Sequence, residues 1–151
     1  MRISCYFNKQ FIPMAPFVEV IIVSEEYNLN HTIDFLIDSG ASTSLLLDKD
    51  IKMLGIDVTK LNPSEKKVYG IGGAVKTYLL PNIQLIFKTT DNNVYKMKLD
   101  ALIGLHDIEK ADKNMKQMVS VMPSLLGRDV IMKFKFMCDG KNKNVYLEGE
   151  G

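Results

Sequence analysis

The residues best suited to chemistry in this sequence are Asp38, Ser39 and Gly40. They stand between two apolar runs, residues 35–37 and 45–47. The pattern predicts a strand that ends at Asp38 and a tight loop after it, because glycine supplies backbone freedom that other residues lack. A carboxyl group at a strand end beside buried neighbours is a candidate for acid/base catalysis. An ordinary surface turn is the alternative, since Asp, Ser and Gly are all common turn residues.

Two later stretches that contain glycine accompany this loop. Residues 69–74 are typical of a mobile hairpin tip, and their central residues are Gly70, Ile71, Gly72 and Gly73. Residues 125–129 have the sequence Leu-Leu-Gly-Arg-Asp, in which two apolar residues of the kind found in cores come directly before a glycine.

A hydrophobic-Asp-Ser-Gly-Ala loop, a glycine-tipped hairpin and a late Leu-Leu-Gly-Arg-Asp, in this order, resemble the retropepsin-like aspartic proteases. The resemblance covers roughly residues 15 to 147. It implies a mostly-β fold, namely an acid-protease closed barrel with a glycine-tipped flap hairpin and one or two short helices. It also implies an aspartic-type endopeptidase.

The single Asp-Ser/Thr-Gly motif, at residues 38–40, predicts a homodimer. Peptide hydrolysis without a metal or a covalent intermediate needs one group that activates water and another that protonates the substrate. Two carboxyl groups in contact do both, because close like charges share a proton, as is known for the aspartic-protease dyad. Asp139-Gly140 lacks the intervening hydroxyl residue and has polar flanks. We therefore expect a second copy of Asp38, related by a two-fold axis, to complete the site.

The resemblance implies a role for each motif residue. The expected catalytic group is Asp38, with Ser39 bonding across the two-fold axis and Gly40 leaving room for the substrate backbone. The expected substrate-binding residues are Ala41, Ser42, Gly70, Ile71, Gly72 and Gly73. The expected structural supports beneath the loop are Leu126, Gly127, Arg128 and Asp129.

Position 42 departs from the viral members of the family, many of which have an aspartate there that pairs with the late arginine. Here the residue is Ser42, so Arg128 lacks its expected partner. The candidate partners are Asp129, Asp48, Asp50 or a group across the dimer interface. A surface ion pair without a role in the site is a further alternative.

Other site classes fit the sequence less well. The segment from Gly70 to Lys76-Thr77 mimics a phosphate-binding loop, but Val75 occupies the position of the glycine before the lysine. His31 and His106 have no Cys or carboxylate at a spacing typical of zinc sites, so we expect no metal and no cofactor. We expect both to be ordinary strand or surface residues. No serine lies in a Gly-x-Ser-x-Gly motif.

Size and composition predict one globular domain over residues 1–151. The net charge of +1 argues against a nucleic-acid or anionic-membrane partner. Two distant cysteines, Cys5 and Cys138, and the lack of an export signal or membrane anchor predict a reduced, cytoplasmic protein.

Hydrophobic periodicity predicts the elements that position the loop. Strands are expected at residues 2–12, 16–24, 31–37, 65–69, 74–80, 82–88, 94–102, 121–126, 136–138 and 144–147. Short helices are expected at 48–54, with Asp48 as N-cap, and at 128–135. Residues 104–119 carry a helical stripe of Ile108, Ala111, Met115 and Met118, which we interpret as core packing within an insertion.

These features predict an aspartic endopeptidase that hydrolyses extended polypeptides between apolar side chains with water activated by two Asp38 carboxyls. The alternative is a catalytically silent dimerisation or peptide-binding module on the same fold, since fold alone does not establish function.

Overall fold

The structure is a computed structural model that describes residues 1–66, 68–70 and 73–150. The described residues are mostly β, as the sequence predicts, with short helices at α1 (Asp48–Leu54), α2 (Lys113–Val121) and α3 (Arg128–Ile131). The strands are β1 (Arg2–Ser4), β2 (Tyr6–Asn8), β3 (Ala15–Ser24), β4 (Leu29–Ile37), β5 (Leu45–Leu46), β6 (Asn62–Pro63), β7 (Tyr69–Gly70), β8 (Gly73–Lys88), β9 (Val94–His106), β10 (Ser124–Leu126), β11 (Lys135–Asp139) and β12 (Asn144–Glu148).

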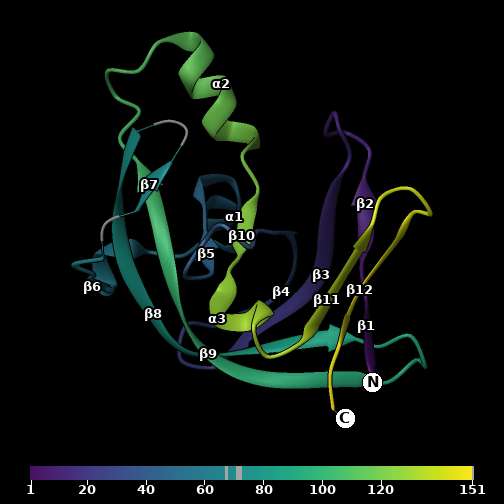
Figure 1. The fold of residues 1–151 in the computed structure, drawn as a ribbon. Coiled ribbons are helices and arrows are strands. Elements are labelled where there is room, and N and C mark those ends of the chain that lie inside the picture. Colours follow the sequence, from purple (N-terminus) through teal and green to yellow (C-terminus); the bar gives the residue numbers. More distant parts are fainter. Residues whose placement is uncertain (67, 71–72, 151) are drawn as a thin grey trace.

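The larger sheet has the strand order β2-β3-β4-β10-β5-β9-β8-β6, and a smaller sheet has the order β1-β12-β11. Strand β3 pairs with β8 as well, from Val20 opposite Phe87 to Val23 opposite Gln84. Strands β8 and β9 form a long antiparallel hairpin along one side of the molecule, and β7 pairs with its outer end (Figure 1). Strand β1 pairs with β12, so the two ends of the chain lie close together.

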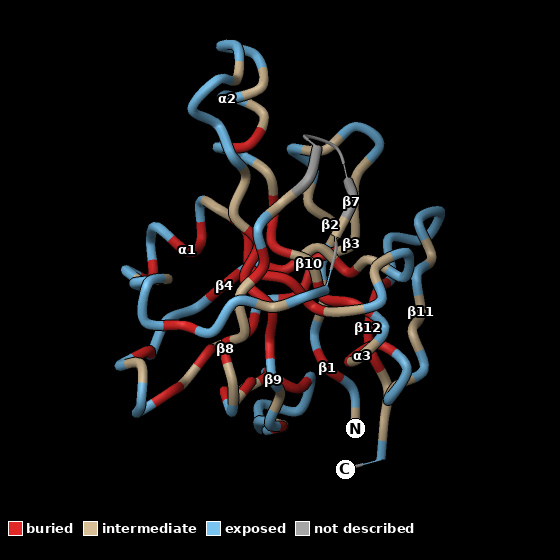
Figure 2. Tube along the Cα trace, turned by 90° about the vertical axis from the view of Figure 1, so that its left-hand side faces the viewer, coloured by how far each residue is buried: buried red, intermediate tan, exposed pale blue. Residues whose placement is uncertain are grey.

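The core follows the alternation that the sequence predicts for β3 and β4. Val18, Val20 and Ile22 are fully buried on β3, and Ile33 and Phe35 face the same core from β4. Figure 2 shows buried segments gathered at the centre of the molecule, around β10. Full burial of each such side chain stabilises the fold by about 1.5–3 kcal/mol. This core holds the end of β4 in place.

The two strands predicted at residues 74–80 and 82–88 are one strand, β8. The strand runs without interruption past Pro81, because a bulge between Leu80 and Ile83 shifts the register opposite β9. A proline lacks the amide hydrogen that a regular ladder needs, and a bulge removes that need. Asn82 takes a positive φ of 54° at this point.

The N-terminal strand predicted at residues 2–12 is two strands, β1 and β2, which join different sheets. Residues 62–63, for which no element was predicted, form the short strand β6 and pair with β8. The helix expected at 128–135 is shorter, because Lys135 already pairs with Glu148 in the smaller sheet.

The prediction that Asp48 caps helix α1 is wrong. The N-cap is Leu47, without a side-chain hydrogen bond, and the helix ends at Gly55 with a φ of 68°. The Asp48 carboxylate instead accepts hydrogen bonds from His106, at the end of β9. A long-range partner therefore replaces the local cap.

The helical region predicted within residues 104–119 lies later in the chain. Strand β9 continues to His106, because Gly104 pairs with Thr77 of β8, and α2 then begins after its N-cap Asp112. The expectation that its apolar stripe packs in the core is wrong, since Val119 is the buried residue of α2. Figure 1 shows that α2 projects from the body of the molecule, near the outer end of the β8–β9 hairpin.

A buried polar pair, Asp50 of α1 and Ser124 of β10, joins two elements near the site. Ser124 Oγ donates to Asp50 Oδ2 at 2.6 Å and accepts from Leu47 N at 3.0 Å. Ser124 is fully buried and Asp50 is 7% exposed. The hydroxyl therefore gives a hydrogen bond to a carboxylate that is almost inaccessible to solvent.

We expect Ser124→Ala to lower the free energy of unfolding by about 2 kcal/mol, because it leaves a buried carboxylate and a buried amide without their partner. Urea denaturation measures the change. Ser120→Ala is the matched control, since the Ser120 hydroxyl is exposed and bonds only to Gln117 O. Equal stability of the two variants would contradict this account of the pair.

Candidate active site

Strand β10 positions the loop that contains Asp38. It runs parallel to β4, with Leu126 opposite Ile37, and Leu126 O accepts a hydrogen bond from Asp38 N at 3.0 Å. Leu126 and Ile37 are both buried. The apolar residue before Gly127 thus holds the backbone of Asp38 directly.

The carboxylate of Asp38 is tied to its own loop. Asp38 Oδ1 accepts from Gly40 N at 2.9 Å, and Asp38 O accepts from Ala41 N at 3.1 Å. A Cβ atom at Gly40 would lie 3.1 Å from Asp38 Oδ1, closer than most such contacts. Glycine at position 40 therefore lets the backbone approach the carboxylate closely.

Gly127 packs against the same loop from below. A Cβ atom there would lie 2.7 Å from Thr43 C and 2.9 Å from both Ala41 O and Thr43 O. Gly127 N donates to Ser44 Oγ at 3.0 Å. Because these neighbours are mainly backbone atoms, they leave no space for a side chain.

The partner of Arg128 is the backbone of the loop. Its Nη1 donates to Ser39 O at 2.8 Å, and its amide donates to Ala41 O at 2.8 Å. Asp129, one of the partners considered for it, instead accepts from the Ser44 amide and, at 2.7 Å, from the Ser44 hydroxyl. Ser44 thus links Asp129 to Gly127, a role that no sequence motif indicated.

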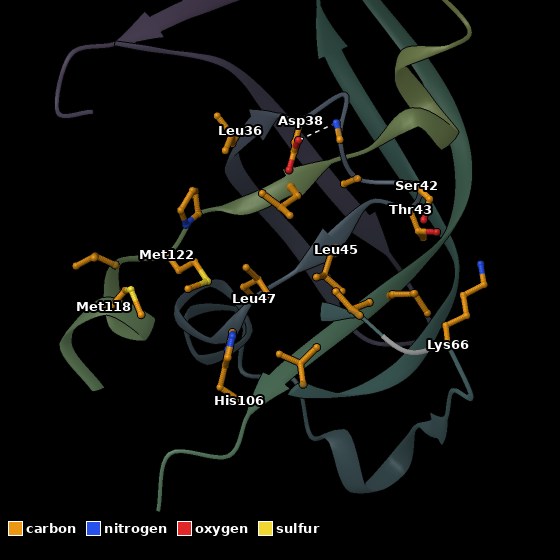
Figure 3. A pocket seen from close by; sticks show the side chains of 18 of the residues that line it. Leu36, Asp38, Ser42, Thr43, Leu45, Leu47, Lys66, His106, Met118 and Met122 are labelled. Atoms are coloured by element: carbon orange, nitrogen blue, oxygen red, sulfur yellow. Dashed lines mark hydrogen bonds between the residues drawn. The ribbon is translucent and has the colours of Figure 1, made fainter. Parts of the chain in front are cut away.

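The Asp38 loop opens into a cavity of about 930 Å³ (Figure 3). Its lining is largely apolar, from residues such as Leu36, Leu45 and Leu125. Asp38 is the one carboxylate among the described residues that line it, and Lys66 and His106 add nitrogen atoms. A pocket of this size with a largely apolar lining can enclose apolar groups of a ligand.

Several of the predicted site residues meet at this cavity, and others lie elsewhere. Asp38, Gly40, Ala41 and Ser42 line it, whereas Ser39 is exposed and turns its carbonyl to Arg128. Gly70 and Gly73 face each other as the pair that ends β7 and begins β8. Ile71 and Gly72 fall outside the described residues. Leu126, Gly127, Arg128 and Asp129 lie beneath the loop.

The sequence motifs missed one wall of the cavity. Met118, Val121 and Met122, from α2 and the residue after it, line the cavity. Figure 3 shows Met118 and Met122 together on one side of it. The apolar stripe noted at residues 108–118 was the available signal, although it was interpreted as core. His106 is a strand residue, as predicted, at the end of β9, and its side chain, which is only 4% exposed, also lines the cavity, which the sequence did not indicate.

Within the described part of the chain, no three His, Cys, Asp or Glu side chains gather as a metal site. The same residues include no helix that is long and apolar enough to span a bilayer.

Comparison with known proteins supports the arrangement of these elements. Residues 23–130 match a protein family described as aspartyl protease. No curated protein matches the sequence. The fold is similar to the crystal structure of a retropepsin-like aspartic protease from Rickettsia conorii, with a TM-score of 0.56, 23% identity and 97% of each chain covered.

A second solved structure, the EIAV protease in complex with an inhibitor, matches with a TM-score of 0.46 and 19% identity, over 78% of this chain and 86% of that one. The family match spans more than two thirds of the chain and contains both the Asp38 loop and Gly127. The chain therefore belongs to the aspartyl protease family and has a retropepsin-like fold.

Proposed function

We propose that the protein is an aspartic endopeptidase whose site is completed by two copies of the chain. The observation that carries this proposal is the position of Asp38, a single carboxylate at the loop end of a large apolar cavity. One carboxylate cannot be base and acid in the same step, so a second one has to come from a partner. A two-fold homodimer supplies it with the same residue.

In the proposed dimer, one Asp38 carboxylate takes a proton from water as the water oxygen attacks the peptide carbonyl carbon. The other Asp38, in its protonated form, gives its proton to the carbonyl oxygen. The tetrahedral intermediate then breaks at the C–N bond: the first Asp38 gives the proton it took from water to the leaving nitrogen, and a hydroxyl of the intermediate returns a proton to the second Asp38 as the carboxyl product forms. The bond from Gly40 N to Asp38 Oδ1 orients the carboxylate for both roles.

The substrate is proposed to be an extended polypeptide cleaved between apolar side chains. Leu36, Leu45 and Leu125 in the cavity wall suit such side chains. Residues 70–73, between β7 and β8, are proposed as the tip of a flap that closes over the peptide and excludes water. Ala41 and Ser42 are proposed to contact its backbone, and Ser39 to bond across the two-fold axis.

We also propose that residues 1–151 form one domain with an insertion near 104–119, and that the larger sheet is the family's closed barrel. Strand β3 pairs with β4 and β8 pairs with β9, and β3 and β8 also pair with each other. This additional pairing joins two separated parts of the strand order and supports the closure.

We expect specific activity to fall as the protein is diluted, because only dimers hold two Asp38 side chains. The measurement combines peptide cleavage over a dilution series with sedimentation velocity at the same concentrations. A statine-type inhibitor should block cleavage and shift the sedimenting species toward the dimer. Constant specific activity in a range where only monomers sediment would contradict the dimeric site. Peptides that bind and stay uncut would instead contradict the peptidase and favour the silent peptide-binding module.

A further inference from the structure

His106, the last residue of β9, is held rigidly at the wall of the cavity. Its amide donates to Asp48 Oδ1 at 3.0 Å, and its ring Nδ1 lies 2.6 Å from Asp48 Oδ2. The side chains are 4% exposed for His106 and 18% for Asp48. Two bonds to one carboxylate leave the ring a single orientation.

This pairing decides which ring nitrogen carries the hydrogen in the neutral imidazole. An ionised carboxylate only accepts hydrogen bonds, so Nδ1 has to be the donor toward Asp48. The other nitrogen, Nε2, is then left as an acceptor. Asp48 thus fixes the tautomer as well as the ring position.

The free nitrogen borders the cavity. Among the described residues, no hydrogen bond reaches Nε2 of His106. In the same residues, every fully buried side-chain nitrogen or oxygen has a hydrogen-bond partner, so an atom without a partner, such as Nε2, is not fully buried. Nε2 therefore reaches open space, and the open space that His106 lines is the cavity. Figure 3 shows His106 and Asp38 at opposite ends of this cavity, with Leu45 and Leu47 between them.

We propose that His106 forms a polar subsite that accepts a hydrogen bond from a substrate side chain at a position away from the cleaved bond. The inference rests on the proposed peptidase function of the same cavity. Most of the surrounding wall is apolar, and Leu47 and Met122 are the labelled neighbours of the ring. In such surroundings an unpaired acceptor is costly, so a bound side chain that can donate is preferred over an apolar one of equal shape.

The rival explanation is that His106 is only a structural tie between β9 and α1. Two substitutions separate the explanations. His106→Asn keeps an amide near the place of Nδ1, where it can still bond to Asp48, and has no atom in the place of Nε2. His106→Gln has the opposite effect, since its amide reaches the place of Nε2.

The test uses pairs of peptides that are identical except for Thr or Val at one position, and the exchange is made at each position of a cleaved peptide in turn. The two peptides of a pair compete in one reaction, which gives the ratio of their kcat/KM values. All variants are compared at the same pH of about 7.5. We expect one position at which the wild-type protein prefers Thr about fivefold, the magnitude of one neutral hydrogen bond. His106→Asn should remove this preference, and His106→Gln should retain part of it.

A Thr preference that appears at no position, or one that His106→Asn leaves unchanged, overturns the subsite. In either case cleavage itself continues, so the proposed peptidase function stands. A protein that cleaves no peptide overturns the peptidase function and the subsite together.

Nitrogen NMR of the imidazole rings provides a readout that does not depend on activity. The chain has two histidines, and His31→Gln identifies their signals. We expect His106 to show the Nδ1–H tautomer, and Asp48→Asn, whose amide can donate to Nδ1, to shift it toward Nε2–H. An Nε2–H tautomer in the wild-type protein would overturn the acceptor role.

Discussion

Replacing Asp38 with Asn is expected to lower kcat for peptide cleavage by about 10³-fold or more, because the exchange removes both the base and the acid of the proposed site. The loop should survive, since an Asn oxygen can still accept the hydrogen bond from Gly40 N. The free energy of unfolding should therefore match that of the wild-type protein to within about 0.5 kcal/mol. The two proteins should also sediment as the same oligomeric state. Steady-state kinetics with a fluorogenic peptide measures the loss.

Asp34→Asn is the matched control for this substitution. Asp34 lies on β4, the strand that leads to Asp38, is exposed, and does not line the cavity. Its replacement should leave kcat unchanged. Turnover that persists in Asp38→Asn at the level of Asp34→Asn would exclude Asp38 as the catalytic group, whatever the state of the fold.

Gly127→Ala is expected to lower the free energy of unfolding by about 2–3 kcal/mol, through overpacking at a site without free space. The new Cβ atom would lie 2.7 Å from Thr43 C and 2.9 Å from Ala41 O. These are backbone atoms of the Asp38 loop, so relief of the clash has to displace the loop itself. Cleavage activity should fall along with stability.

Gly140→Ala is the control, because a Cβ atom at Gly140 meets nothing within 4 Å and this glycine does not have a positive φ. Its effect on stability should stay within about 0.5 kcal/mol. Urea denaturation compares the two variants. If Gly127→Ala proves as stable and active as Gly140→Ala, the close packing described beneath the loop is wrong.

The local features of the fold could be predicted from the sequence. Hydrophobic periodicity indicated a strand at residues 16–24, and the structure has β3 there, with Val18, Val20 and Ile22 buried. The loop at Asp38 and the helix at Asp48–Leu54 were predicted from apolar runs, small residues and Gly55. Such signals lie within a few residues of the element that they specify, so they can be read without knowledge of the fold.

Predictions failed where a distant partner overrides a local signal. Asp48 has a typical capping side chain, but His106, 58 residues away, takes its carboxylate. Pro81 indicated a break, but the register shift opposite β9 absorbs it. The methionine stripe indicated core packing, but α2 projects from the body and contributes Met118 and Met122 to the cavity wall.

By itself the sequence determined the mostly-β character of the chain and the family to which it belongs, and it indicated Asp38 as the candidate catalytic group, because these depend on periodicity and on a contiguous motif. Only the tertiary structure decided that Arg128 bonds to Ser39 O, that Ser44 joins Asp129 to Gly127, and that His106 faces the cavity. The hydrogen bonds among these join residues 83 to 89 positions apart. The physical reason is that such pairs are chosen by how the strands pack, and packing depends on the whole chain at once.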